Sequence, residues 1–107
     1  MEETDKDLSP LPRKEIKKQL KNLKGWEFKI NKISKTFEFV NFTEAVKFVD
    51  GLVNFCNSID HHPDIFISYK IIRFELTRFS VGGKVTDRDF TVAKKIEEDF
   101  AKKQKKF

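Results

Sequence analysis

Residues 26–39 read WEFKINKISKTFEF, and apolar and charged side chains alternate along both halves of this stretch. Residues 26–30 place Trp, Phe and Ile between Glu and Lys, which is the period of two that a half-buried strand requires. Asn31-Lys32 reads as a tight turn. The chain then continues on a single parity, with apolar side chains at Ile33, Phe37 and Phe39. The stretch therefore predicts an antiparallel β-hairpin.

A helix is predicted on each side of this hairpin. Pro12 suits the first turn of the earlier helix, whose apolar positions recur at helical spacing, and Gly25 ends it. Residues 41–44, Asn-Phe-Thr-Glu, form a capping box that opens the later helix. Phe48 and Phe55 predict a second apolar ridge on that helix, for another subunit (which we favour) or for the protein's own core. The main apolar stripe consists of Ala45, Val46, Val49, Leu52, Val53 and Cys56.

The second half of the chain repeats the pattern of the first. Residues 65–69 and 72–77 read as two short strands or one bent strand, and Gly82-Gly83 reads as a turn. Thr86 is the predicted N-cap of a last helix, and Asp89 lies at its N3 position, where a carboxylate suits the helix dipole. The order αββαββα predicts an α+β fold: a four-stranded antiparallel sheet with helices on one face.

Length and composition predict a single domain over residues 1–107, with frayed ends at 1–9 and 102–107. No apolar run approaches the roughly 20 residues that span a bilayer, so no membrane partner is expected. The lone Cys56 excludes an internal disulfide and fits a reducing, cytoplasmic location. The net charge of +5 rests on lysine-rich segments. Arginine is scarce and no aromatic side chain interrupts the basic tail, so a nucleic-acid partner is not expected.

His61-His62-Pro63-Asp64 lies where the second predicted helix ends and an extended segment begins, and it holds both histidines of the chain. Histidine exchanges protons near neutral pH, so the motif indicates proton-transfer chemistry. The alternative is a polar helix end whose imidazoles cap backbone carbonyls. A metal site here would need further ligands such as Asp60 or Asp64, and adjacent histidines rarely chelate one ion, so no metal is expected.

Taken together, these segments resemble the pterin-4a-carbinolamine dehydratase family, almost from end to end. The resemblance implies the fold predicted above, assembled as a homodimer or homotetramer. It also implies dehydration of a 4a-hydroxytetrahydropterin to the quinonoid dihydropterin, which recycles a tetrahydrobiopterin-type cofactor and needs no cofactor of its own. Some members also serve as dimerisation cofactors of a homeodomain transcription factor. The matching segments are Glu15-Ile16, Leu20 through Gly25-Trp26, Phe37-Glu38-Phe39, Phe42-Thr43-Glu44-Ala45 with Phe48, His61-His62-Pro63-Asp64-Ile65 with Tyr69, and Gly82-Gly83 with Thr86, Asp89 and Ala93.

The resemblance and the chemistry of the side chains together give each candidate site residue an expected role. His61 and His62 are the expected general acid and base, in either order, and both also contact the substrate. Asp60 is expected to orient an imidazole or the pterin amide. Further substrate contacts are expected from Thr77, Arg78, Phe79 and Ser80, with Phe79 stacking on the pterin and Arg78 donating to its carbonyl.

This chain departs from the family pattern at three places. Phe79 stands where the family usually carries a third histidine, Asn57 stands where an acidic residue is common, and the Gly-Gly turn holds an extra residue near Lys84. The sequence therefore predicts a dehydratase with reduced or altered activity. The alternative is a catalytically weak homologue that acts as a pterin-binding or protein-association module.

Overall fold

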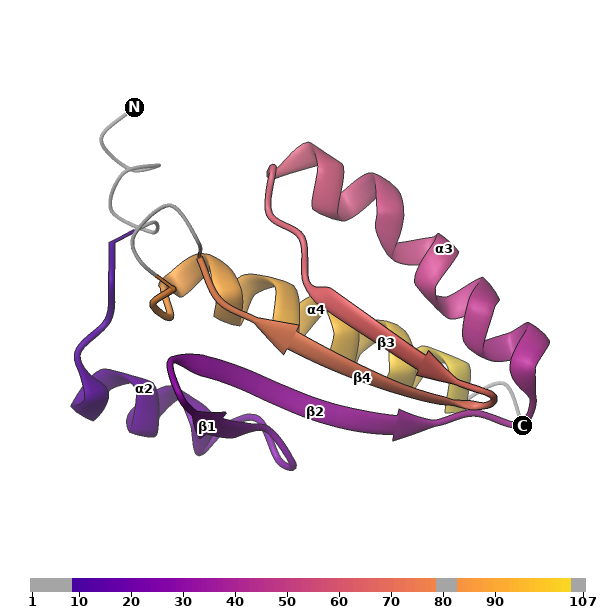
Figure 1. Cartoon of the computed structure of the whole chain (residues 1–107), viewed down its shortest axis with the longest axis horizontal. Helices are drawn as coiled ribbons and strands as arrows, with labels where there is room; N and C mark the ends of the chain where they lie inside the picture. Colours follow the sequence, from indigo (N-terminus) through magenta and orange to yellow (C-terminus); the bar gives the residue numbers. More distant parts are fainter. Residues whose placement is uncertain (1–8, 79–82, 105–107) are drawn as a thin grey trace.

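The computed structural model describes residues 9–78 and 83–104, and their element order confirms the predicted αββαββα arrangement. Figure 1 shows the elements in the order of the chain. Phe79, Ser80 and Gly82 lie outside the described residues, so the predictions made for them stay predictions. The elements are α2 (Arg13–Leu20), β1 (Glu27–Lys29), β2 (Lys32–Glu38), α3 (Phe42–Ser58), β3 (Asp64–Ser68), β4 (Ile71–Leu76) and α4 (Asp87–Gln104).

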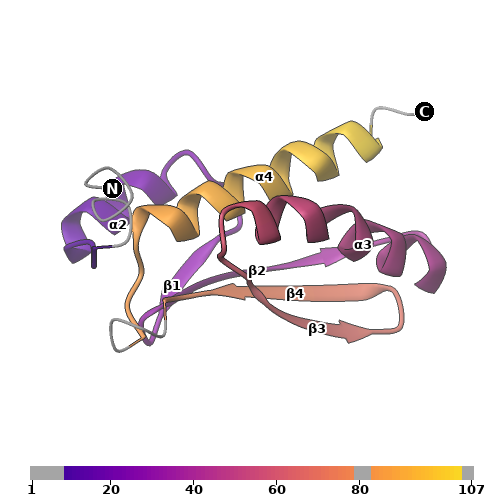
Figure 2. The same cartoon turned by 90° about the horizontal axis from the view of Figure 1, so that it is seen from above.

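The four strands form one antiparallel sheet in the order β1-β2-β4-β3. Side chains alternate between its two faces, so Ile72, Phe74 and Leu76 of β4 are fully buried while Arg73 between them is exposed. Figure 2 shows α3 and α4 on the same side of the sheet. The structure therefore confirms the predicted sheet with helices on one face.

Aromatic side chains fill the core between the sheet and the helices. The ring of Phe37 on β2 lies 4.8 Å from that of Phe100 on α4, and the ring of Phe48 on α3 lies 5.1 Å from that of Phe39. Phe48 is thus part of the core, and the favoured interpretation of it as an outward ridge is wrong. The reason is a rotation of α3, which buries Ala45, Phe48, Leu52 and Cys56 and leaves Val46 and Val53 exposed at 41% and 45%.

The β1–β2 turn lies one residue earlier than the sequence predicts. Lys29 pairs with Lys32, so Ile30 and Asn31 form the turn, with φ angles of 49° and 62°. A two-residue hairpin favours positive φ at these positions, which a β-branched residue such as Ile30 adopts only under strain. The side chain of Ile30 also lies in solvent, with 85% of its surface exposed. The hydroxyl of Thr77 donates to the Asn31 carbonyl at 2.8 Å and fastens the turn to the end of β4.

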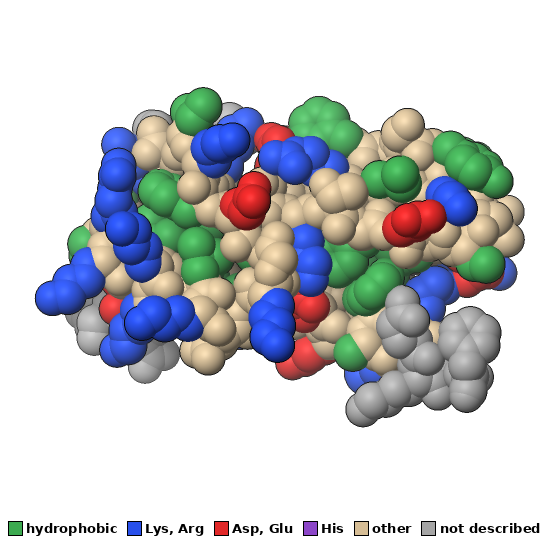
Figure 3. Space-filling view, turned by 90° about the horizontal axis from the view of Figure 1, so that it is seen from below, with side chains coloured by type: hydrophobic (Ala, Val, Ile, Leu, Met, Phe, Trp, Pro, Cys, Tyr) green, Lys and Arg blue, Asp and Glu red, His purple; other side chains and the backbone are tan. Residues whose placement is uncertain are grey.

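The first helix is shorter than its pattern suggests, because α2 ends at Leu20 and the chain turns through Lys24 before Gly25. Gly25 then takes a φ of 86°, which favours glycine. Figure 3 shows Lys and Arg side chains gathered at the end of the molecule that carries α2. At the other end of the chain, residues 102–104 belong to α4, although the sequence predicts a frayed end from 102. Among the described residues, no helix is long and apolar enough to cross a membrane.

Candidate active site

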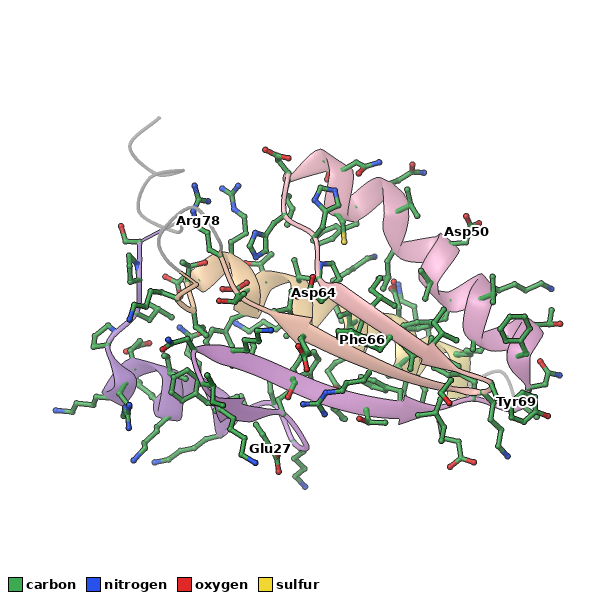
Figure 4. All side chains as sticks on the ribbon, in the orientation of Figure 1. Glu27, Asp50, Asp64, Phe66, Tyr69 and Arg78 are labelled. Atoms are coloured by element: carbon green, nitrogen blue, oxygen red, sulfur yellow. The ribbon has the colours of Figure 1, made fainter. Side chains whose placement is uncertain are left out.

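Three segments of the chain meet at one end of the molecule. They are the connection between α3 and β3 (residues 59–63), the end of β4 (residues 77–78) and the start of α4 (residues 86–89). Arg88 on α4 joins two of them, because its Nη1 donates to the carbonyl of Ile59 at 2.8 Å. Figure 4 shows Arg78, from the end of β4, beside the start of α4.

The end of α3 sets the direction of the two histidines. The N–H of Asp60 donates to the Asn57 carbonyl at 3.2 Å, and the N–H of His61 donates to the Cys56 carbonyl at 3.1 Å. These two hydrogen bonds define a Schellman motif, with Asp60 in the left-handed position at φ 52°. The chain reverses direction here, so the imidazoles of His61 and His62 are directed to different partners.

His61 forms a buried pair with Asp89 on α4. The imidazole Nε2 hydrogen-bonds to Asp89 Oδ1, and the two side chains are only 7% and 0% exposed. The other carboxylate oxygen, Oδ2, accepts the N–H of Thr86 at 2.8 Å and its hydroxyl at 3.3 Å. Asp89 therefore caps α4, as the sequence predicts, and also orients His61. With Nε2 donating to the carboxylate, Nδ1 of His61 remains for chemistry.

His62 is exposed and its imidazole Nε2 lies 2.8 Å from the Asn57 side-chain oxygen. The amide oxygen is an acceptor, so Nε2 carries the hydrogen and Nδ1 keeps its lone pair. Asn57 is one of the departures from the family pattern, and it gives His62 a neutral partner where His61 has a carboxylate. The two imidazoles thus sit in electrostatically different surroundings.

The remaining predicted site residues lie in different settings. Thr77 is only 6% exposed and its hydroxyl is bonded to Asn31, so in this structure it serves the hairpin turn. Asp60 is exposed on the α3–β3 connection, whereas Arg78 is half-buried. Phe79 and Ser80 lie outside the described residues.

Asp89 is not among the site residues predicted from the sequence, because only its capping role is visible in the local pattern. The contact with His61 crosses 28 residues of chain. One feature of the sequence could have indicated this contact: a carboxylate that caps a helix with one oxygen has a second oxygen that can accept another hydrogen bond. In the described part of the chain, no three His, Cys, Asp or Glu side chains are grouped to hold a metal ion. Cys56 is buried beneath this end of α3, and burial raises the pKa of its thiol.

The fold and this site define a class: an α+β domain with two adjacent imidazoles, one backed by a buried carboxylate, suited to acid–base chemistry. The family model for pterin 4 alpha carbinolamine dehydratase matches residues 9–98. The chain belongs to the pterin 4 alpha carbinolamine dehydratase family.

Similar proteins share both the sequence and the fold. A protein of Sulfolobus acidocaldarius described as "Putative pterin-4-alpha-carbinolamine dehydratase" is 44% identical over 86 residues, which cover 80% of this chain and 93% of that protein. One of Sulfurisphaera tokodaii with the same description is 43% identical, over 85% of this chain and 97% of its own. A crystal structure of a transcriptional coactivator/pterin dehydratase from Brucella melitensis superposes with a TM-score of 0.80 at 27% identity, covering 85% of this chain and 98% of that one.

Proposed function

We propose that this protein dehydrates a 4a-hydroxytetrahydropterin to the quinonoid dihydropterin and so recycles a tetrahydrobiopterin-type cofactor. The observation that carries the proposal is the buried His61–Asp89 pair beside the second histidine. Membership of the family supports the substrate class. A carbinolamine loses water readily once its hydroxyl oxygen gains a proton and the neighbouring nitrogen loses one, so a positioned acid and base suffice.

The different partners of the two imidazoles suggest which histidine is the general acid and which is the general base. The Asp89 carboxylate can balance the positive charge of a doubly protonated His61, so His61 is the proposed acid. Asn57 is neutral, so His62 is the proposed base. His62 Nδ1 takes the proton from N5 of the pterin, and the C4a=N5 double bond forms as the C4a–O bond breaks. His61 Nδ1–H protonates the departing oxygen, which leaves as water.

The setting proposed for this activity is a homo-oligomer, a dimer or a tetramer, in the cytoplasm. The open edge of the sheet at β3 supports self-association, because an unpaired edge is commonly closed by a second copy. The free thiol of Cys56 supports a reducing compartment. Asp60, exposed beside the histidines, is the proposed partner of the pterin amide. The proposed contacts of Phe79 and Ser80 with the substrate rest on the sequence alone.

The dehydration of synthetic 4a-hydroxytetrahydropterin, followed by ultraviolet absorbance, tests the function. We expect wild type to accelerate the spontaneous reaction, and His61→Ala and His62→Ala each to lose about 10²- to 10⁴-fold of that acceleration. Ser58→Ala is the matched control: it changes the same turn of α3, where its hydroxyl only bonds the Phe55 carbonyl. Its rate should equal that of wild type.

A wild-type rate no faster than buffer would reject the dehydratase. Titration with a stable pterin would then test the alternative, a pterin-binding or association module. Retained binding, reduced in His62→Ala, would support that module.

A further inference from the structure

We infer that Asn57 is a positioning residue for His62, and that its neutral side chain sets the lowest pH at which the site works. This inference rests on the proposed function, in which His62 is the base, and deepens it. A base accepts a proton only while it is uncharged, so the partner of its imidazole decides the pH range of the reaction.

Each imidazole of the site is held by a residue at a helix end. Asp89, in the first turn of α4, bonds Nε2 of His61. Asn57, in the last turn of α3, has the same relation to His62, because its Oδ1 lies 2.8 Å from Nε2 of that ring. The backbone carbonyl of Asn57 also accepts the N–H of Asp60 at 3.2 Å. One residue therefore holds both neighbours of His61, one through its main chain and one through its side chain.

The contact between Asn57 and His62 depends on the chain reversal at the end of α3. The two residues are five apart in the sequence, whereas side chains that meet on a helix are three or four apart. The left-handed turn at Asp60, with a φ of 52°, brings the ring back to Asn57. The direction of Nδ1, which takes the proton, is thus fixed by this turn and this hydrogen bond.

The two partners bond the same ring atom but differ in charge. A carboxylate stabilises an imidazolium strongly, whereas the neutral oxygen of an amide does so much less. Two carboxylate partners would charge both rings over one pH range, and the reaction needs one charged and one uncharged ring together. Asn57 therefore leaves His62 able to accept a proton at a lower pH than a carboxylate would. The same neutrality makes His62 a weaker base, so the maximum rate is lower.

Other charged side chains lie at this end of the molecule. In the part of the chain that the structure describes, no carboxylate forms an ion pair with His62, whose imidazole bonds Asn57. Asp89 is occupied by His61 and Thr86. The charged or titratable side chains of the neighbouring segments are Asp60, His61 and Asp64 around the α3–β3 connection, Arg78 at the end of β4, and Asp87, Arg88 and Asp89 on α4. All of them are common to the variants compared below, so differences between these variants report the change at residue 57.

The first measurement is an NMR titration of the two imidazoles, which needs no substrate. The chain has only two histidines, and His62→Ala assigns their resonances. Asn57→Asp keeps the size of the side chain and its acceptor oxygen and adds a charge. It should raise the midpoint of the His62 titration by roughly 0.2–0.7 pH unit, as exposed ion pairs do. The control Asn54→Asp adds the same charge at an exposed position about one turn earlier on α3 and should leave the midpoint nearly unchanged.

The second measurement is the dehydration rate against pH, after subtraction of the spontaneous rate. The profiles of wild type and Asn57→Asp should cross. The variant should be up to about twofold slower on the acidic side, and up to about twofold faster on the alkaline side, where its stronger base is uncharged. Asn57→Ala releases the ring without adding charge, so it should lose roughly tenfold at every pH. Asn54→Asp should follow wild type.

The outcomes separate this inference from the proposed function. Equal His62 midpoints in wild type and Asn57→Asp would overturn the inference, whether or not the protein is active. A raised midpoint with parallel rate profiles would also overturn it, because the charge of His62 would then not limit the reaction. A raised midpoint in a protein that fails to accelerate dehydration would support the control of His62 by Asn57 and reject the proposed function.

Discussion

Asp60 occupies a position that does not favour it. It is the left-handed residue of the Schellman motif, at φ 52°, where glycine or asparagine is usual. Its carboxylate also lies at the C-terminal end of α3, where the helix dipole disfavours negative charge. A residue kept against local stability is a candidate for function.

Asp60→Asn should therefore stabilise the protein while harming its activity. Removing the charge from the helix end should raise the free energy of unfolding by about 0.3–1 kcal/mol, measured by urea denaturation. The dehydration rate should fall, because the carboxylate proposed to hold the pterin amide is lost. Asp50→Asn, an exposed change in the middle of the same helix, should alter the rate little. A less stable Asp60→Asn would mean that the carboxylate serves the fold.

At the scale of the element, β3 is an open edge strand. Ser68 and Ile71 flank a two-residue turn, so they form a hydrogen-bonded pair of the β3–β4 ladder. Hydrogen-bonded and non-hydrogen-bonded pairs alternate along such a ladder. Ile67 consequently directs its backbone N–H and C=O away from β4, toward the open edge. Phe66 and Ile67 are 54% and 40% exposed, which adds apolar surface to that edge. The strand at the opposite edge of the sheet, β1, has only three residues, so it offers fewer backbone groups for pairing with a second copy.

Ile67→Pro should separate the proposed oligomer. Proline removes the outward N–H and leaves the β3–β4 ladder intact, because that N–H takes no part in it. Size-exclusion chromatography with light scattering should give the monomer mass of 12.6 kDa, against a multiple of it for wild type. Circular dichroism checks that the monomer stays folded, and Ile67→Val, which keeps the N–H, should remain associated. Equal masses for wild type and both variants would reject pairing through β3.

At the scale of the whole molecule, the buried thiol of Cys56 makes global stability depend on pH. Burial raises the pKa of the thiol in the folded protein, so the unfolded chain releases this proton at a lower pH. The contribution to stability is complete below the ordinary thiol pKa of about 8.5 and is lost as the pH rises toward the folded value.

Wild type should therefore lose stability between pH 8 and pH 10 more steeply than Cys56→Ala. Urea denaturation at several pH values measures this, and the comparison of the two proteins removes the titration of the many lysines. Both proteins should keep the same dehydration rate at pH 7, since the thiol is buried within the core. Parallel stability curves would show that the thiol does not ionise differently on unfolding.

The sequence predicts what local chemistry specifies and misses what the packing of distant segments decides. Asn41 and Thr86 are correctly identified as helix caps, because capping depends on neighbours three residues away. The prediction that Phe48 forms an outward ridge is wrong, because the rotation of α3 depends on which of its faces packs best against the aromatic side chains of the sheet. At the site, His61 and His62 stand out from the sequence, whereas the pairing of His61 with Asp89 exists only after α4 has packed.

That pairing has a consequence for how the site fails. Thr86 and His61 share one carboxylate, so the first turn of α4 and the imidazole are released together whenever the helix start opens. The equilibrium between the open and the closed helix start then sets the fraction of molecules whose His61 is oriented. The amide hydrogen of Thr86, which Asp89 protects, is thus a built-in reporter: the solvent exchange of a single proton reads out whether the site is assembled.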